Sequence, residues 1–195
     1  MAVNRNNRPD GPRSGAGRGA GISGTVEIRP ERADDIPAIG AVNRLAFGQA
    51  DEAALVDALR DGGFGVISLV AEDAGRIVGH IFFSRLPVEA GDRVVAGAAL
   101  APLAVLPDRQ REGIGSALVG AGLAACQTAG IAAVVVLGHP DYYPRFGFSA
   151  LAARGLRSPF PGAGDAFMAL ELVPGSLDLR DAVVRYAPTF GIADG

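Results

Sequence analysis

Apolar residues recur along this chain at two spacings, and each spacing predicts a different kind of element. Near the beginning they recur every three or four positions, which is the period of one helix face. These residues are Ile36, Ile39, Val42, Leu45 and Ala46 in a first group, and Leu55, Val56 and Leu59 in a second. We therefore expect helices over residues 31–48 and 51–63, the second ended by Gly62 and Gly63.

Shorter apolar runs, rich in β-branched residues, follow these helices and predict strands. Residues 66–73 and 76–89 flank Asp73-Ala74-Gly75, a sequence typical of a hairpin turn. Residues 93–107 predict a longer strand, which should be bulged or unpaired near Pro102 because proline has no N–H to donate. Further strands are expected over residues 25–30, and near 149–152 and 166–173.

An uncharged run over residues 113–140, apart from His139, is long enough to cross a bilayer, but its two halves differ in kind. The first half is rich in Ala and Gly, whereas the second contains the run AAVVVL, residues 132–137, with three consecutive β-branched valines. A buried helix followed by a buried strand explains both halves, so we expect no membrane segment. Gly130 should cap the helix. The residues expected to pack against strands are Ile114, Leu118, Ala121 and Ala125, with Gly120 and Gly122 allowing close approach.

The composition is that of an ordinary globular protein. Of the 195 residues 49% are hydrophobic and 20% are charged, and the net charge of −3 gives no reason to expect nucleic acid as a partner. Residues 1–24 combine many Gly and Arg with almost nothing to bury, so we expect a disordered arm followed by a single domain over residues 25–195. The start of the chain lacks the apolar stretch of a signal peptide, which favours the cytoplasm.

Cysteine and histidine usage argues against several kinds of site. Cys126 is the only cysteine, so an internal disulfide and a cysteine-based metal cluster are excluded. It lies among Ala and Gly in a predicted helix, where a buried, inert thiol is expected rather than a nucleophile. His80 and His139 are the only histidines, and no metal-ligand spacing joins them, so we expect no metal.

The segment RQREGIGSALV, residues 109–119, lies where the long strand ends and the glycine-containing helix begins. The first amides of a helix have no intrahelical partner and attract anions, so this segment is either a phosphate seat or a sharp turn that uses glycine only for close backbone approach. Leu118 stands where a dinucleotide fingerprint requires a third glycine. The absence of Lys excludes a phosphate loop that requires Gly-Lys-Ser/Thr. Together with the flanking strands the segment predicts a βαβ-like crossover.

Four motifs in this order resemble the GNAT superfamily of acetyl-coenzyme A-dependent N-acyltransferases, most closely its YhbS-like branch. They are PLAV (102–105), QREGIGSAL (110–118), VVVLG (134–138) and YYPRFGF (142–148), and the ending YAPTF (186–190) is also similar. The pattern Gln/Arg-x-x-Gly-x-Gly/Ala is matched by Gln110, Gly113 and Gly115. The likeness extends over about residues 26–190. It implies an α/β (α+β) fold with a central mixed, mostly antiparallel sheet flanked by helices.

The resemblance also implies a function: transfer of an acetyl group from acetyl-coenzyme A to a primary amine, by direct attack. The amides of residues 111–116 would hold the pyrophosphate, while residues 103–105 would pair with the pantetheine arm and polarise the thioester. Arg109 and Arg111 could add charged contacts. Tyr143, in the pattern Tyr-x-x-x-Gly-Phe, is the candidate general acid, and Tyr142 is its rival. The candidate coenzyme-binding residues are Leu103, Ala104, Val105, Gln110, Arg111, Glu112, Gly113, Ile114, Gly115 and Ser116.

The sequence leaves the acceptor and the general base open. Residues 94–107 carry no ionisable side chain, where many relatives have a carboxylate. The groups that a water could link to the reaction are Glu89, Asp92, His80 and Asp141, although each suits a structural or surface position. The acceptor could be a small molecule, a peptide or a protein, and a homodimer is compatible with each. The missing base keeps one alternative, a non-catalytic acyl-coenzyme A sensor or assembly module on the same fold.

Overall fold

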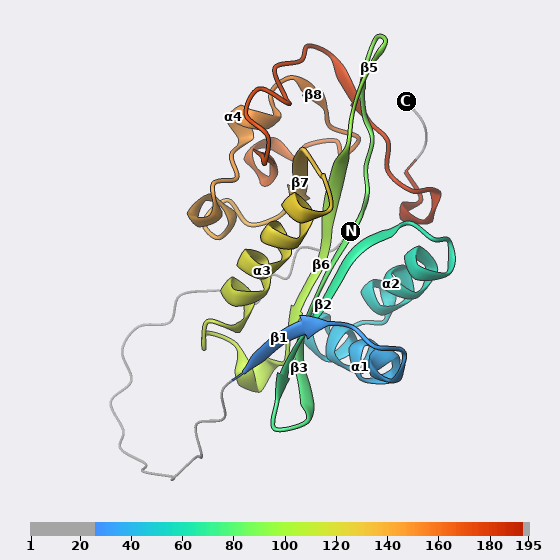
Figure 1. The fold of residues 1–195 in the computed structure, drawn as a ribbon, viewed down its shortest axis with the longest axis vertical. Coiled ribbons are helices and arrows are strands. Elements are labelled where there is room, and N and C mark those ends of the chain that lie inside the picture. The colour runs from blue at the N-terminus through green and yellow to red at the C-terminus, as the bar shows by residue number, and fades with distance from the viewer. Residues whose placement is uncertain (1–25, 193–195) are drawn as a thin grey trace.

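A six-stranded mixed sheet forms the centre of the computed structural model, which describes residues 26–192 (Figure 1). The predicted arm over residues 1–24 lies outside the described residues. The strand order is β1-β2-β3-β6-β7-β9, and neighbours are antiparallel except for the parallel pair β6–β7. The expected mostly antiparallel sheet is confirmed. Its strands are β1 (Glu27–Pro30), β2 (Gly65–Asp73), β3 (Arg76–Arg85), β6 (Gly97–Val105), β7 (Ala133–Leu137) and β9 (Phe167–Glu171).

Helices cover both faces of this sheet. The helices α1 (Ile36–Phe47) and α2 (Asp51–Asp61) lie on one face, and α3 (Ile114–Thr128) lies on the other (Figure 1). A short 3-10 helix, η1 (Ala33–Asp35), leads into α1. The predicted apolar faces are confirmed at Ile39, Val42, Val56 and Leu59, which are buried.

Leu45 does not belong to the buried face of α1, contrary to the sequence prediction, because 59% of it is exposed. The polar residue Asn43 is fully buried on that helix instead, and its side chain contacts His80 at 3.2 Å. A hydrogen-bond partner on the sheet therefore allows a polar residue to take a core position. The apolar period alone could not indicate this exchange.

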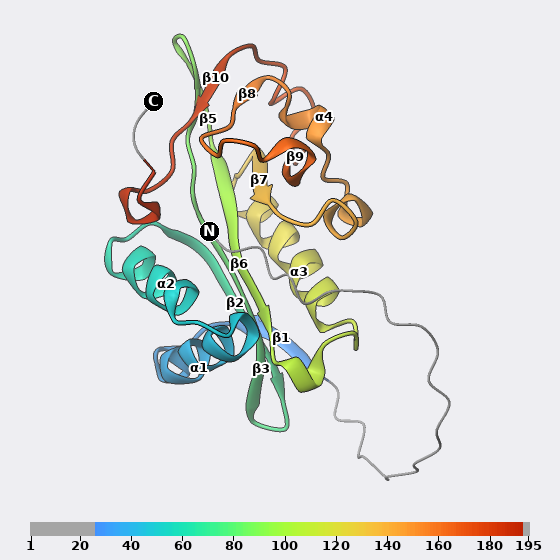
Figure 2. The same cartoon turned by 180° about the vertical axis from the view of Figure 1, so that it is seen from behind.

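Two predicted strands are each divided, because the chain passes between two sheets. The 76–89 strand ends at Arg85, and Pro87 separates it from β4 (Val88–Ala90). The 93–107 strand is divided at Ala96 into β5 (Arg93–Val95) and β6. A second sheet of order β5-β4-β10-β8 is completed by β8 (Leu156–Arg157) and β10 (Ala182–Val184), as Figure 2 shows.

Residues 149–152 do not form a strand, and this prediction is corrected: Ser149 makes only an isolated antiparallel bridge with Ala169. They begin the short helix α4 (Ala150–Ala153), whose first residue is preceded by Ser149. The Ser149 side chain accepts a hydrogen bond from the Ala152 amide at 3.1 Å, which is the usual way a serine caps a helix. The other expected strand, near 166–173, is confirmed as β9, with the 3-10 helix η4 (Gly164–Ala166) before it.

Packing of α3 confirms most of its predicted features. Ile114 and Leu118 are buried, and a Cβ at Gly122 would overlap the Phe83 ring, so this glycine is needed for close approach to the sheet. Gly120 is exposed, with nothing within 4 Å of a Cβ there, so its expected packing role is wrong. Gly130 has a left-handed φ of 76° and ends the helix as predicted. Over residues 26–192, every helix is too short or too polar to cross a membrane.

The strand β6 is irregular on both of its edges. Toward β3 the register shifts between Ile81 and Phe83, which are paired with Leu103 and Leu100, so the bulge expected near Pro102 is confirmed. Toward β7, β6 pairs only through its first residues, from Gly97 to Ala99. Beyond that point β7 continues to pair with β9, and the described residues provide no ladder partner for the rest of this edge of β6. The rest of this edge of β6 could therefore pair with an extended ligand.

Candidate active site

The segment of residues 109–116, here called the arch, connects β6 to α3. Its first residue, Arg109, is the last residue of the 3-10 helix η2 (Pro107–Arg109). Arg111 and Gly113 have left-handed φ angles of 68° and 86°, and Gly113 is the N-cap of α3. Left-handed residues in such a turn direct successive amides toward one concavity, which suits an anion. The Ala117 amide donates to the Gly113 carbonyl at 2.9 Å, so the helical ladder begins there. The first amides of a helix have no intrahelical partner.

Side chains tie the arch to the sheet at two places. Arg109 Nε donates to Glu112 Oε2 at 2.8 Å, and Arg109 Nη1 donates to Asp73 Oδ2 at 2.7 Å. Both carboxylates raise the pKa of the Arg109 guanidinium. Gln110 Nε2 donates to the Val105 carbonyl at 3.1 Å. Because Asp73 ends β2, Arg109 anchors the arch to the β2–β3 hairpin, whereas the sequence suggested a contact with the coenzyme.

The open edge of β6 and the arch meet at Gly115. A Cβ on this glycine would lie 3.8 Å from Val105 and 3.9 Å from Leu103, whose side chains share one face of β6. Ala104 points to the other face and is buried. The two groups of residues that the sequence assigned to the coenzyme are therefore adjacent in space. The absence of a side chain at Gly115 keeps the space between them open.

The two consecutive tyrosines after β7 have different surroundings. Tyr143 begins the 3-10 helix η3 (Tyr143–Phe146) and is buried against Gly138, where a Cβ would overlap its ring. It also packs edge-on against Phe148 at 5.7 Å. Burial raises the pKa of Tyr143. Tyr142 is half-buried, and its hydroxyl lies next to Gly115, 2.9 Å from the position of a Cβ. The sequence did not indicate which hydroxyl would reach the arch.

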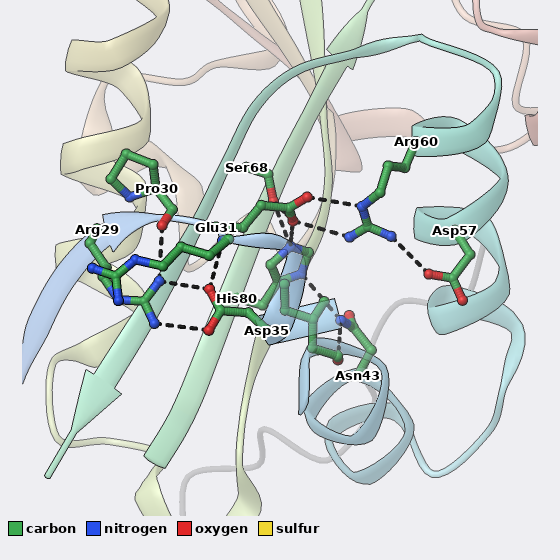
Figure 3. Close-up of polar contacts among 11 residues, drawn as sticks. Arg29, Pro30, Glu31, Asp35, Asn43, Asp57, Arg60, Ser68 and His80 are labelled. Atoms are coloured by element: carbon green, nitrogen blue, oxygen red, sulfur yellow. Dashed lines mark hydrogen bonds and ion pairs between the residues drawn. The ribbon is translucent and has the colours of Figure 1, made fainter. Parts of the chain in front are cut away.

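A buried polar network lies beneath α1 and α2 (Figure 3). Asn43 Nδ2 donates to the Ile39 carbonyl at 2.9 Å and contacts His80 Nδ1 at 3.2 Å. His80 Nε2 lies 3.0 Å from Ser68 Oγ, and the Ser68 hydroxyl donates to Glu31 through a short hydrogen bond. This order makes Nδ1 an acceptor and places the single imidazole proton on Nε2.

Electrostatics keep His80 neutral. Burial lowers the pKa of His80 to about 4; the nearby Glu31 acts in the opposite direction, and Arg60 acts with burial. Arg60 Nε pairs with the Glu31 carboxylate at 2.9 Å, which gives that charge its own partner. His80 therefore supports α1 on the sheet, and it is too enclosed to accept a proton from a substrate. Among the other candidate bases, the Glu89 carboxylate forms an ion pair with Arg185, whose Nε lies 2.9 Å from Glu89 Oε2.

Other reactive side chains are not grouped into a metal centre. Within residues 26–192, no group of three His, Cys, Asp or Glu side chains gathers at one place. Cys126 is buried in α3, as predicted, and burial raises the pKa of its thiol to about 12. Such a thiol is inert toward acyl groups at neutral pH.

Comparison with known proteins points to one family. Residues 27–151 match the acetyltransferase (GNAT) domain. The chain is 38% identical over 164 residues to the uncharacterized N-acetyltransferase YhbS of Escherichia coli K12, covering 84% of this chain and 97% of the relative. It is also 38% identical over 130 residues to the uncharacterized N-acetyltransferase YjhQ of the same strain, covering 65% of this chain and 72% of the relative.

Solved structures give the same result. The crystal structure of Escherichia coli YhbS in complex with CoA matches with a TM-score of 0.80 and 35% identity, over 89% of this chain and 96% of that one. A GNAT family acetyltransferase from Brucella melitensis, in complex with acetyl-CoA, matches with a TM-score of 0.70 and 37% identity, over 85% and 98% of the two chains.

Proposed function

This chain belongs to the GNAT acetyltransferase family, and from that premise we propose that it transfers the acetyl group of acetyl-CoA to a primary amine of a small molecule, peptide or protein. One observation carries the proposal: the open edge of β6 meets the glycine arch at Gly115. An unpaired strand edge suits an extended amide-containing arm, and the start of a helix suits a pyrophosphate. Acetyl-CoA contains both groups, and the Brucella melitensis relative is bound to it.

The arch and β6 bind different parts of the coenzyme. The amides of residues 111–116 hold the pyrophosphate, with added charge from Arg111 and with the arch fixed by Gln110 and Glu112. Leu103, Ala104 and Val105 form the stretch of β6 that pairs with the pantetheine arm, beside the Val105 carbonyl that accepts from Gln110. An amide of the same strand polarises the thioester carbonyl and stabilises the oxyanion that forms during attack.

Tyr143 is the candidate general acid for the departing thiolate. A phenol is protonated at neutral pH, and the ring of Tyr143 is fixed between Gly138 and Phe148. A fixed, protonated phenol can donate to a leaving group in the transition state. The acetyl group passes directly to the amine, without a covalent enzyme intermediate.

β6 has no carboxylate that could take a proton from an ammonium group. The amine must therefore lose its proton before it reaches the thioester. Water carries that proton away from the site. The same absence favours the second candidate function, a non-catalytic acyl-CoA sensor or assembly module. This alternative binds the coenzyme as tightly but transfers nothing.

A screen for free-thiol release separates the two functions. The protein is incubated with acetyl-CoA and a panel of amines, peptides and proteins, and coenzyme binding is measured in parallel by calorimetry. Acetyl transfer predicts thiol release that depends on one class of acceptor. Tight coenzyme binding with no release from any acceptor would favour the sensor instead.

A further inference from the structure

The Tyr142 hydroxyl lies beside the proposed coenzyme seat, at the start of α3. It lies 2.9 Å from the position that a Cβ would take on Gly115, and it interacts with the Ser116 side chain. Gly115 and Ser116 belong to the first turn of α3, whereas Tyr142 follows β7. The side chain therefore spans the mouth of the gap between β6 and β7.

The ring of Tyr142 is held by contacts that leave its hydroxyl at one position. Tyr143 packs edge-on against it at 5.1 Å, and Phe146 packs at 5.4 Å. The Arg145 guanidinium lies 4.6 Å from the ring centre, and Arg145 Nε donates to the Tyr142 carbonyl at 2.9 Å. A phenylalanine could make the same ring contacts, so packing alone gives no reason for the hydroxyl.

The hydroxyl adds a donor to a place that already contains donors. Burial raises the pKa of Tyr142, although Ser116 and Arg145 act against this, so the phenol is protonated at neutral pH. Next to it are the amides at the start of α3, which have no intrahelical partner. Converging donors are satisfied together by a ligand that offers only acceptors, and phosphate oxygens at this pH are acceptors.

We propose that Tyr142 is a coenzyme-binding residue whose hydroxyl donates a hydrogen bond to the pyrophosphate of CoA. This inference rests on the proposed coenzyme seat and divides the tyrosine pair into two roles. Tyr142 binds the phosphate end of the coenzyme, whereas Tyr143 acts on the thiolate.

Calorimetry with CoA tests this division directly, without any need for an acceptor. Tyr142→Phe keeps the ring and removes one hydrogen bond to a charged group, so the Kd for CoA should rise about tenfold. ADP, measured as a competitor of CoA, contains the pyrophosphate and should lose about the same factor. Pantetheine lacks the pyrophosphate and should bind both proteins equally. Tyr143→Phe is the matched control, and its Kd for CoA should not change.

A second variant tests the same contact from the other side. A Cβ in Gly115→Ala would displace the Tyr142 hydroxyl, while alanine is a residue that the family pattern allows at this position. It should weaken CoA binding in the wild type and have little further effect in the Tyr142→Phe background, because both changes remove one interaction.

Three results would overturn the assignment. Unchanged CoA affinity in a folded Tyr142→Phe would reduce Tyr142 to a packing residue. Additive effects of the two substitutions would show that the glycine acts independently of the hydroxyl. Loss of turnover with normal binding in Tyr142→Phe would make it the general acid. Failure of the wild type to bind CoA is a different outcome, because it removes the seat itself and hence the proposed function.

Discussion

Lowering the pH from 7 to 5 should destabilise the folded protein through His80. This residue is fully buried, and Asn43 occupies its Nδ1 acceptor position, so a second proton has no place in the folded state. Burial lowers its pKa from 6.5 to about 4. In the unfolded chain the imidazole is in water and takes up a proton at its ordinary pKa.

The size of the effect follows from the difference between these pKa values. As the pH falls below 6.5 the unfolded state binds a proton that the folded state does not, so stability declines until the folded pKa of about 4 is reached. At about 1.4 kcal/mol per pH unit, roughly 2 kcal/mol is lost between pH 7 and pH 5. The lowered pKa values of Glu31 and Asp35 remove stability only in more acidic solution, below their ordinary values of 4.5 and 3.8.

Urea unfolding at the two pH values measures this loss. His80→Gln can retain a donor and an acceptor but cannot titrate, so it should be less stable at pH 7 and lose much less on going to pH 5. His139→Gln removes the only other histidine and tests whether the loss is specific to His80. An equal loss in wild type and His80→Gln would refute the assignment of the pH dependence to His80.

Three further predictions concern catalysis and the arch. Tyr143→Phe should lower turnover about 10²-fold with coenzyme affinity unchanged, and a normal rate would leave the ring only a packing role. Gly113→Val should raise the Kd for CoA tenfold or more, because a β-branched residue is strained at a φ of 86°; the exposed Gly120→Val is the control. Arg109→Ala and Asp73→Asn should each raise the KM for acetyl-CoA several-fold, without additivity in the double variant, whereas additive effects would contradict the anchor.

Much of the fold could be predicted because neighbouring segments differ in the spacing and the type of their apolar residues. Residues 114–128 are rich in Ala and Gly and residues 134–136 are three β-branched valines, so the helix and the strand of the crossover were both found. The divisions at Pro87 and Ala96 were not found, because they reflect the passage of the chain from one sheet to another. Such a passage depends on strands distant in sequence, among them β10, which is only three residues long.

At the candidate site, the sequence predicted the position of the backbone segment but not the directions of its neighbouring side chains. The arch could be located because its glycines stand at a fixed spacing between a strand and a helix. The direction of each tyrosine side chain could not be predicted, because Tyr142 and Tyr143 are adjacent in sequence. Only the geometry of η3 turns Tyr142 toward Gly115 and Tyr143 toward Gly138. Arg109 resembled a phosphate ligand because Asp73 is distant in the sequence.

The central claim, acetyl transfer from a coenzyme seated on the arch to an amine, is tested most directly by a balance of the acetyl group. Acetyl-CoA labelled in its acetyl group is incubated with the protein and the best acceptor from the screen, and labelled product and free CoA are both quantified. The account predicts that labelled N-acetyl product and free CoA appear in equal amounts, and that Gly113→Val forms both much more slowly at a coenzyme concentration below the wild-type Kd. Free CoA without labelled amine, or unchanged transfer by Gly113→Val, would contradict it.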